Sequence, residues 1–219
     1  MHIQTLTLPS FSEIYIKYVR LQTENEEGKD KTVVIIPGFF GTIEERYPLA
    51  QAFLKYYNVI LYEPRGYGKS SELHVKGIYD IASYANEMRE IFQELNLQSQ
   101  KFTIFGSSLA VAMIHQYSAF LEGEKPEPAA LLLASPSPKY REAGIFKRIE
   151  WFPDWLFSLF QKIVFLWLKI TRNKKERKDV KYAEKRFYDN DPWVQRRIAI
   201  ESLGVVDFRG HEGTIPYPL

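Results

Sequence analysis

Four short apolar segments between residues 32 and 133 constrain the fold of this chain more than any other feature. They read TVVII from Thr32, NVILY from Asn58, FTIF from Phe102 and AALLL from Ala129. Runs that are almost wholly apolar and rich in β-branched residues are typical of strands buried on both faces, as in a parallel sheet. Helical patterns at 44–57, 79–95 and 109–120 separate or follow these strands. The alternation predicts βαβ units, and hence an α/β fold with a mostly parallel sheet flanked by helices.

The two ends of the chain differ from this central pattern. Residues 2–8 and 12–21 alternate apolar and polar side chains around a break at Pro9 and Ser10, which predicts a β-hairpin at a sheet edge. Residues 145–203 have only helical or irregular patterns. We therefore expect an α/β core over 1–138, a helical cap inserted over 139–210, and the start of the next core strand over 211–219.

Composition excludes several function classes. The net charge is +2, from 29 basic and 27 acidic residues, so nothing global indicates a nucleic acid partner. The chain has no cysteine, and its four histidines are scattered without ligand spacing, so we expect no metal and no cofactor. The first ten residues lack the pattern of a signal peptide, which together with the lack of cysteine leads us to expect a cytoplasmic protein.

The strongest candidate for chemistry is the sequence FGSSLA at Phe105–Ala110, between a predicted strand and a predicted helix. A nucleophile elbow needs this context, because a tight strand-to-helix turn lifts its serine out of the sheet. Such a turn is crowded, and Gly106 and Ala110 supply small residues two positions either side of Ser108. The alternative is an ordinary helix start at which Ser107 or Ser108 is the N-cap.

Two glycine-bearing loops follow other predicted strands. The first, PGFFGT at residues 37–42, could turn backbone N–H groups toward a ligand, or could be a plain turn. The second, EPRGYGKS at residues 63–70, lacks the spacing of a phosphate loop and does not open a helix as a dinucleotide fingerprint does. By itself it is a basic, glycine-rich turn.

The order of these three motifs, each after a buried strand, resembles the α/β-hydrolase superfamily. Members of that family have a His-Gly or related loop, then D-x-R-G-x-G-x-S, then G-x-S-x-G. The resemblance is close over residues 32–137 and looser to residue 219. This chain departs from the pattern at Pro37 in place of histidine, Glu63 in place of aspartate and Ala110 in place of glycine.

The resemblance implies a role for each motif. Ser108 would be the nucleophile, and the backbone N–H groups of Phe39 and Leu109 would form the oxyanion hole. The small residues of the loop and the elbow would be Gly38, Gly41, Gly106 and Ala110. The reaction implied is hydrolysis of an ester, thioester or related acyl bond of a small hydrophobic substrate. Serine at position 108 argues against epoxide hydrolase and haloalkane dehalogenase chemistry, which uses a carboxylate there.

In the family the chain order is serine, acid, histidine. Here the predicted cap is followed by TIPYPL, which resembles the start of the acid-bearing strand, and the sequence given ends. His115 lies seven residues after Ser108, roughly 10 Å along a helix, which is too far to accept its proton. His74 and His211 remain alternatives, whereas His2 lies in an edge strand. Three explanations stay open: a truncated or split hydrolase, a non-catalytic relative that binds a hydrophobic ligand, or an unusual base.

Residues 151–170 form an aromatic apolar segment that charged and polar residues interrupt too often for a membrane span. From 172 to 186 there are eight Lys or Arg and three Asp or Glu, a balance of 8 − 3 = +5. One interpretation is a cap helix packed on the sheet, lining a hydrophobic pocket. The other is peripheral contact of residues 151–186 with an anionic membrane.

Overall fold

The computed structural model describes residues 1–120, 123–135, 153–171, 180, 184, 188 and 190–203. Its centre is a six-stranded sheet in the order β1-β2-β4-β3-β5-β6. Strands β1 and β2 form the predicted antiparallel hairpin, and β2 also pairs antiparallel with β4. Strands β4, β3, β5 and β6 are parallel to one another. The strand bounds are β1 Gln4–Leu8, β2 Phe11–Leu21, β3 Thr32–Ile36, β4 Asn58–Glu63, β5 Phe102–Ser107 and β6 Ala130–Ala134.

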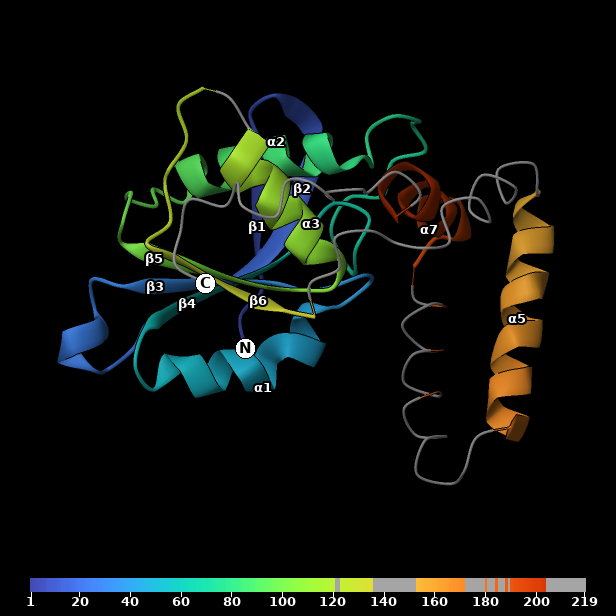
Figure 1. Cartoon of the computed structure of the whole chain (residues 1–219), viewed down its shortest axis with the longest axis horizontal. Helices are drawn as coiled ribbons and strands as arrows, with labels where there is room; N and C mark the ends of the chain where they lie inside the picture. Colours follow the sequence, from blue (N-terminus) through green and yellow to red (C-terminus); the bar gives the residue numbers. More distant parts are fainter. Residues whose placement is uncertain are drawn as a thin grey trace.

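Helices cover both faces of this sheet, which is why its central strands are apolar throughout (Figure 1). Helix α1, Ile43–Leu54, lies on one face; α2, Ile81–Glu94, and α3, Leu109–His115, lie on the other. Successive residues of a strand point to opposite faces. In β3, Val33 and Ile35 therefore join the cluster under α1, while Val34 and Ile36 join the larger cluster under α2 and α3.

Two shorter turns of other helix types complete the core. A 3-10 turn, η1 Glu26–Gly28, precedes β3, and a π-helical turn, η2 Gln116–Phe120, extends α3. The helix predicted over 109–120 therefore exists, but it changes type after His115. The prediction of an α/β fold with a mostly parallel, helix-flanked sheet is confirmed.

After β6 the described chain is helical. Helix α5, Asp154–Thr171, stands at the periphery, and α7, Pro192–Ile198, lies between it and the sheet, followed by a π-helical turn, η3 Ala199–Leu203 (Figure 1). One interpretation of residues 151–170 is a helix packed on the sheet. The structure differs, because this helix, α5, packs mainly on α7. None of the described helices is long and apolar enough to cross a bilayer. The strand expected at 211–219 lies outside the described residues.

Candidate active site

Ser108 occupies a strained turn between the end of β5 and the start of α3. Its backbone angles are φ 55° and ψ −123°, in the left-handed half of conformational space that L residues avoid. Its side chain makes no capping hydrogen bond, although it sits at the N-cap position of α3. Ser108 is exposed, whereas every residue of α3 is buried. The structure therefore does not support the alternative of an ordinary serine N-cap at position 108.

The turn is fixed on both sides by backbone hydrogen bonds. The Ser108 N–H donates to the Ala134 carbonyl of β6 at 3.1 Å, and the Val111 N–H donates to the Ser108 carbonyl at 2.9 Å. A Cβ added to Gly106 would lie 3.3 Å from the Ala110 Cβ and 2.3 Å from the Ile114 Cδ1. The small residues that the sequence places on either side of the serine thus meet each other inside the turn.

The loop after β3 lies directly against this turn. A Cβ added to Gly38 would be 2.8 Å from the Ser107 carbonyl oxygen and 3.3 Å from the Ser108 Cβ, so only glycine fits without a backbone shift. The Gly41 N–H donates to the Gly38 carbonyl at 2.7 Å, which closes the loop. Phe40 is buried with φ 52°, and its ring centroid lies 4.0 Å from that of Phe39. Phe39 therefore follows the glycine that touches the serine turn, and Leu109 is the first residue of α3.

Glu63, at the end of β4, ties the third motif to the first loop. One of its carboxylate oxygens accepts the Ile43 N–H at 2.8 Å, and the other accepts the Lys69 N–H at 2.7 Å. Burial raises the pKa of Glu63, although the two backbone donors oppose this shift. A Cβ at Gly68 would lie 2.4 Å from the Glu63 Cδ, so the turn wraps closely around the carboxylate. Glu63, which stands where the family pattern has aspartate, thus accepts one hydrogen bond from α1 and one from its own turn.

Arg65, from the same motif, is buried rather than facing a ligand. Its Nε lies 3.3 Å from the Glu87 Oε2 of α2, and both side chains are almost wholly buried. The Tyr84 hydroxyl donates to the Arg65 carbonyl at 3.0 Å. Burial raises the pKa of Glu87, and the neighbouring guanidinium partly opposes this. Of the two basic residues of this turn, Arg65 is therefore neutralised inside the protein, whereas Lys69 pairs with Glu44 at the surface.

Arg46 is a site neighbour that the sequence did not indicate. Its Nη2 donates to the Ser107 Oγ at 3.4 Å, which places a cation from α1 beside the serine turn. The two residues are 61 positions apart, and no motif links them. The pairing of β3 with β5 brings α1 and the turn together.

The histidines weighed as bases lie in different surroundings. The His74 Nε2 lies 3.3 Å from the Asp191 Oδ1, and its ring stacks on Trp193 at 4.9 Å, so its contacts are with the start of α7. His115 is the last residue of α3 and is buried. His2 is exposed at the start of the chain, before β1. His211 lies outside the described residues.

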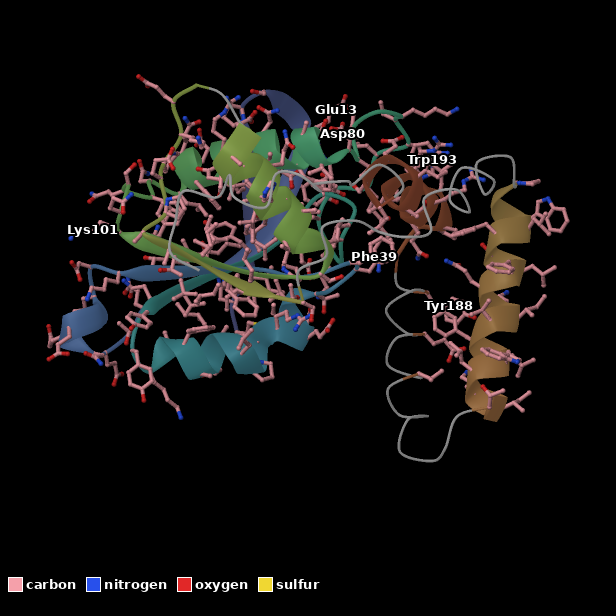
Figure 2. All side chains as sticks on the ribbon, in the orientation of Figure 1. Glu13, Phe39, Asp80, Lys101, Tyr188 and Trp193 are labelled. Atoms are coloured by element: carbon pink, nitrogen blue, oxygen red, sulfur yellow. The ribbon has the colours of Figure 1, made fainter. Side chains whose placement is uncertain are left out.

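An open cavity of about 350 Å³ lies elsewhere in the molecule. It is lined by Thr32, Phe102 and Ala130, the first residues of β3, β5 and β6, and by Lys101. Ser108 and the Gly38 loop lie at the opposite, carboxyl ends of these strands. Figure 2 shows the same separation, with Lys101 at one end of the sheet and Phe39 at the end toward α7. In open α/β sheets ligands bind at the carboxyl ends, so this cavity is not the candidate site.

A strained, exposed serine between a parallel strand and a helix, beside a glycine loop from the neighbouring strand, defines an α/β protein of the hydrolase type. The family model described as "alpha/beta hydrolase fold" matches residues 31–195, and the chain belongs to this family.

Solved structures agree on the fold at low sequence identity. A hydrolase from Pseudomonas aeruginosa PA01 has a TM-score of 0.74 and 14% identity, over 99% of this chain and 78% of that one. A bromoperoxidase from Bacillus anthracis has a TM-score of 0.73 and 18% identity, over 99% and 79%. An enol-lactonase from Burkholderia xenovorans LB400 has a TM-score of 0.70 and 14% identity, over 98% and 78%. No curated protein matches the sequence.

Proposed function

We propose that this protein is a serine hydrolase that cleaves an ester, thioester or related acyl bond of a small hydrophobic molecule through an acyl-serine intermediate. The conformation of Ser108 carries the proposal. Holding a serine at φ 55° costs about 1–3 kcal/mol, and residues strained in this way cluster at functional sites. Here it leaves the side chain exposed and without a capping bond at the carboxyl edge of the sheet.

The reaction follows from this placement. The Ser108 Oγ attacks the acyl carbon and gives up its proton to a base, and the carbonyl oxygen becomes an oxyanion. The Phe39 and Leu109 N–H groups would donate to that oxyanion. The tetrahedral intermediate then collapses, expels the protonated leaving group and leaves the acyl-serine. Water attacks the acyl carbon in turn, and this releases the acid and restores the Ser108 hydroxyl.

Two further observations support this assignment. The first residue of a helix has no acceptor for its N–H within the helix, and Leu109 holds that position in α3. A Cβ added to Gly38 would lie 3.3 Å from the Ser108 Cβ, so Phe39 directly follows a glycine that lies close against the same turn. The half-buried Phe39 ring, in contact with Phe40, adds apolar surface here, which favours a hydrophobic substrate.

Hydrolysis of activated aryl esters with acyl chains of increasing length tests the proposal. We expect turnover that Ser108→Ala abolishes. Gly38→Ala should reduce the rate at least tenfold, because an added methyl group must displace the Ser107 carbonyl. Gly77→Ala is the control: alanine at φ +80° strains the backbone there, but its Cβ would meet nothing within 4 Å, so turnover should stay near that of the wild type. Equal turnover in the wild type and Ser108→Ala would reject the proposal.

The alternative function is a non-catalytic protein that binds a hydrophobic ligand. The pairing of His74 with Asp191 favours it, since this histidine is held by the segment before α7. This alternative predicts that the folded protein does not turn over the esters but binds them saturably. It also predicts that Ser108→Ala leaves this binding unchanged.

A further inference from the structure

Helix α5 is attached to the rest of the protein by one face. Phe157, Gln161 and Phe165 are buried on that face. The Gln161 Nε2 donates to the Gln195 Oε1 of α7 at 2.6 Å. The Phe165 ring lies 6.2 Å from that of Tyr188, which Figure 2 shows beside the helix. These contacts fix the orientation of α5, so its opposite face must point away from the protein.

The opposite face is apolar and open to solvent. Its large apolar side chains recur at three- and four-residue steps and are 45% to 67% exposed. They are Trp155, Leu159, Phe160, Ile163, Leu166, Trp167 and Ile170. We call this set the outer face of α5; Figures 1 and 2 show α5 itself at the edge of the molecule. A contiguous apolar surface of this kind is uncommon on a monomer and marks an interaction site.

The charges of α5 and of the sequence after it are mostly positive. The helix has two lysines and one acidic residue, Asp154, at its first position. Lys162 is exposed at the margin of the outer face, and Lys169 pairs with Glu184. The sequence that follows, 172–186, adds a balance of 8 − 3 = +5. A partner that fits must therefore offer an apolar interior beneath a negatively charged surface.

We propose that the outer face of α5 docks on an anionic lipid bilayer, with the helix lying in the plane of the interface. Amphipathic helices with Trp, Phe and Leu on one face and lysines beside it bind membranes in this way. Trp155 and Trp167 would sit at the headgroup level, and Lys162 would extend its ammonium to the lipid phosphates. This proposal goes beyond the proposed hydrolase function and does not depend on Ser108.

A second copy of the chain fits the outer face less well. In a two-fold pair of antiparallel helices, the residues nearest the two-fold axis lie next to their own copies. Lys162 lies at the midpoint of α5, Asp154–Thr171, so a pair centred on the outer face would bring the two lysines together on the same side. This like-charge contact opposes dimerisation, whereas an anionic headgroup layer would neutralise both charges.

Flotation of the full chain with vesicles tests the proposal. The vesicles are pure phosphatidylcholine or phosphatidylcholine mixed with phosphatidylserine, each at low and high ionic strength. We expect binding to the mixed vesicles that weakens as salt rises. Trp155→Gln with Trp167→Gln should weaken partitioning roughly tenfold or more, since burying a large apolar side chain contributes about 1.5–3 kcal/mol.

Tyr56→Gln is the matched control, because Tyr56 is 59% exposed but lies next to α1. It should bind vesicles as the wild type does, and circular dichroism should show all variants folded. If the protein binds neither vesicle type, the proposal is overturned. This holds for a monomer, and also for a dimer that the Trp155→Gln and Trp167→Gln changes dissociate. Equal loss of binding in the Tyr56→Gln control would also overturn it.

Discussion

The carboxylate of Glu63 accepts the backbone N–H of Ile43 at 2.8 Å, so the last residue of β4 holds the first residue of α1. Its second oxygen accepts the Lys69 N–H at 2.7 Å. The loop that contacts Ser108 ends where α1 begins, and this one buried carboxylate therefore fixes the end of that loop.

Glu63→Gln should destabilise the protein by about 1–3 kcal/mol, because the amide NH₂ would face one of the two backbone N–H groups that the carboxylate accepts. Urea unfolding measures the change. Glu44→Gln is the control: Glu44 pairs with Lys69 on the surface, and its loss should cost at most about 1 kcal/mol. An unchanged midpoint in Glu63→Gln would mean that the Glu63 carboxyl is protonated in the folded protein.

Ser108→Gly should stabilise the fold, whereas Ser108→Ala should leave its stability nearly unchanged. Glycine accepts φ 55° without strain, which returns about 1–3 kcal/mol, less about 0.5–1 kcal/mol for its more flexible unfolded chain. Alanine keeps the Cβ and hence the strain. Thermal unfolding of the two variants measures the difference; a Ser108→Gly variant less stable than Ser108→Ala by about 0.5–1 kcal/mol would show that the turn stores no strain.

Arg65 and Glu87 form a buried pair that should behave as a unit. Arg65→Met alone leaves Glu87 without its cation and should cost about 3–5 kcal/mol. Adding Glu87→Gln should recover part of that loss, because glutamine removes the charge and still accepts the Arg65 N–H bond. A double-mutant cycle by urea unfolding measures the coupling. Strictly additive losses would contradict this account.

The single variant Arg65→Met should also be sensitive to pH. Burial raises the pKa of Glu87, and removing the guanidinium raises it further. The folded state then holds a proton that the unfolded state releases near about pH 4.5, so stability falls as pH rises above that value. The wild type should show a smaller fall over the same range.

Buried tyrosines should limit stability at high pH. Burial raises the pKa of Tyr62, Tyr84 and Tyr117, and raises that of Tyr79 to about 12. Above about pH 10 the unfolded state loses phenolic protons that the folded state keeps, so stability falls by about 1.4 kcal/mol per pH unit for each such tyrosine. Urea unfolding at increasing pH measures the slope, and tyrosinate absorbance should rise further on unfolding. A flat stability profile up to about pH 11 would contradict these shifts.

Much of the core could be predicted because its signals are local. TVVII and NVILY are apolar on both faces, and the sheet covers both faces of β3 and β4 with helices. The small residues Gly106 and Ala110 on either side of Ser108 predict the serine turn, and the structure brings these two residues together within it. The assignments of Ser108, Phe39 and Leu109 to catalysis remain predictions.

The rest depends on contacts between distant residues. Arg46 reaches Ser107 across 61 positions, and Asn190 accepts the Gly68 N–H across 122. The sequence also could not tell which face of α5 is buried, since apolar residues occur on both. Packing on α7 decides that Phe157 and Phe165 are inside and that Trp155 is outside.

The most direct measurement of the central claim is covalent labelling with a fluorophosphonate, followed by intact mass and peptide mapping. The account predicts one adduct on the folded protein, located on Ser108 and lost in Ser108→Ala. An adduct on another residue, or none on a protein that circular dichroism shows to be folded, would contradict it.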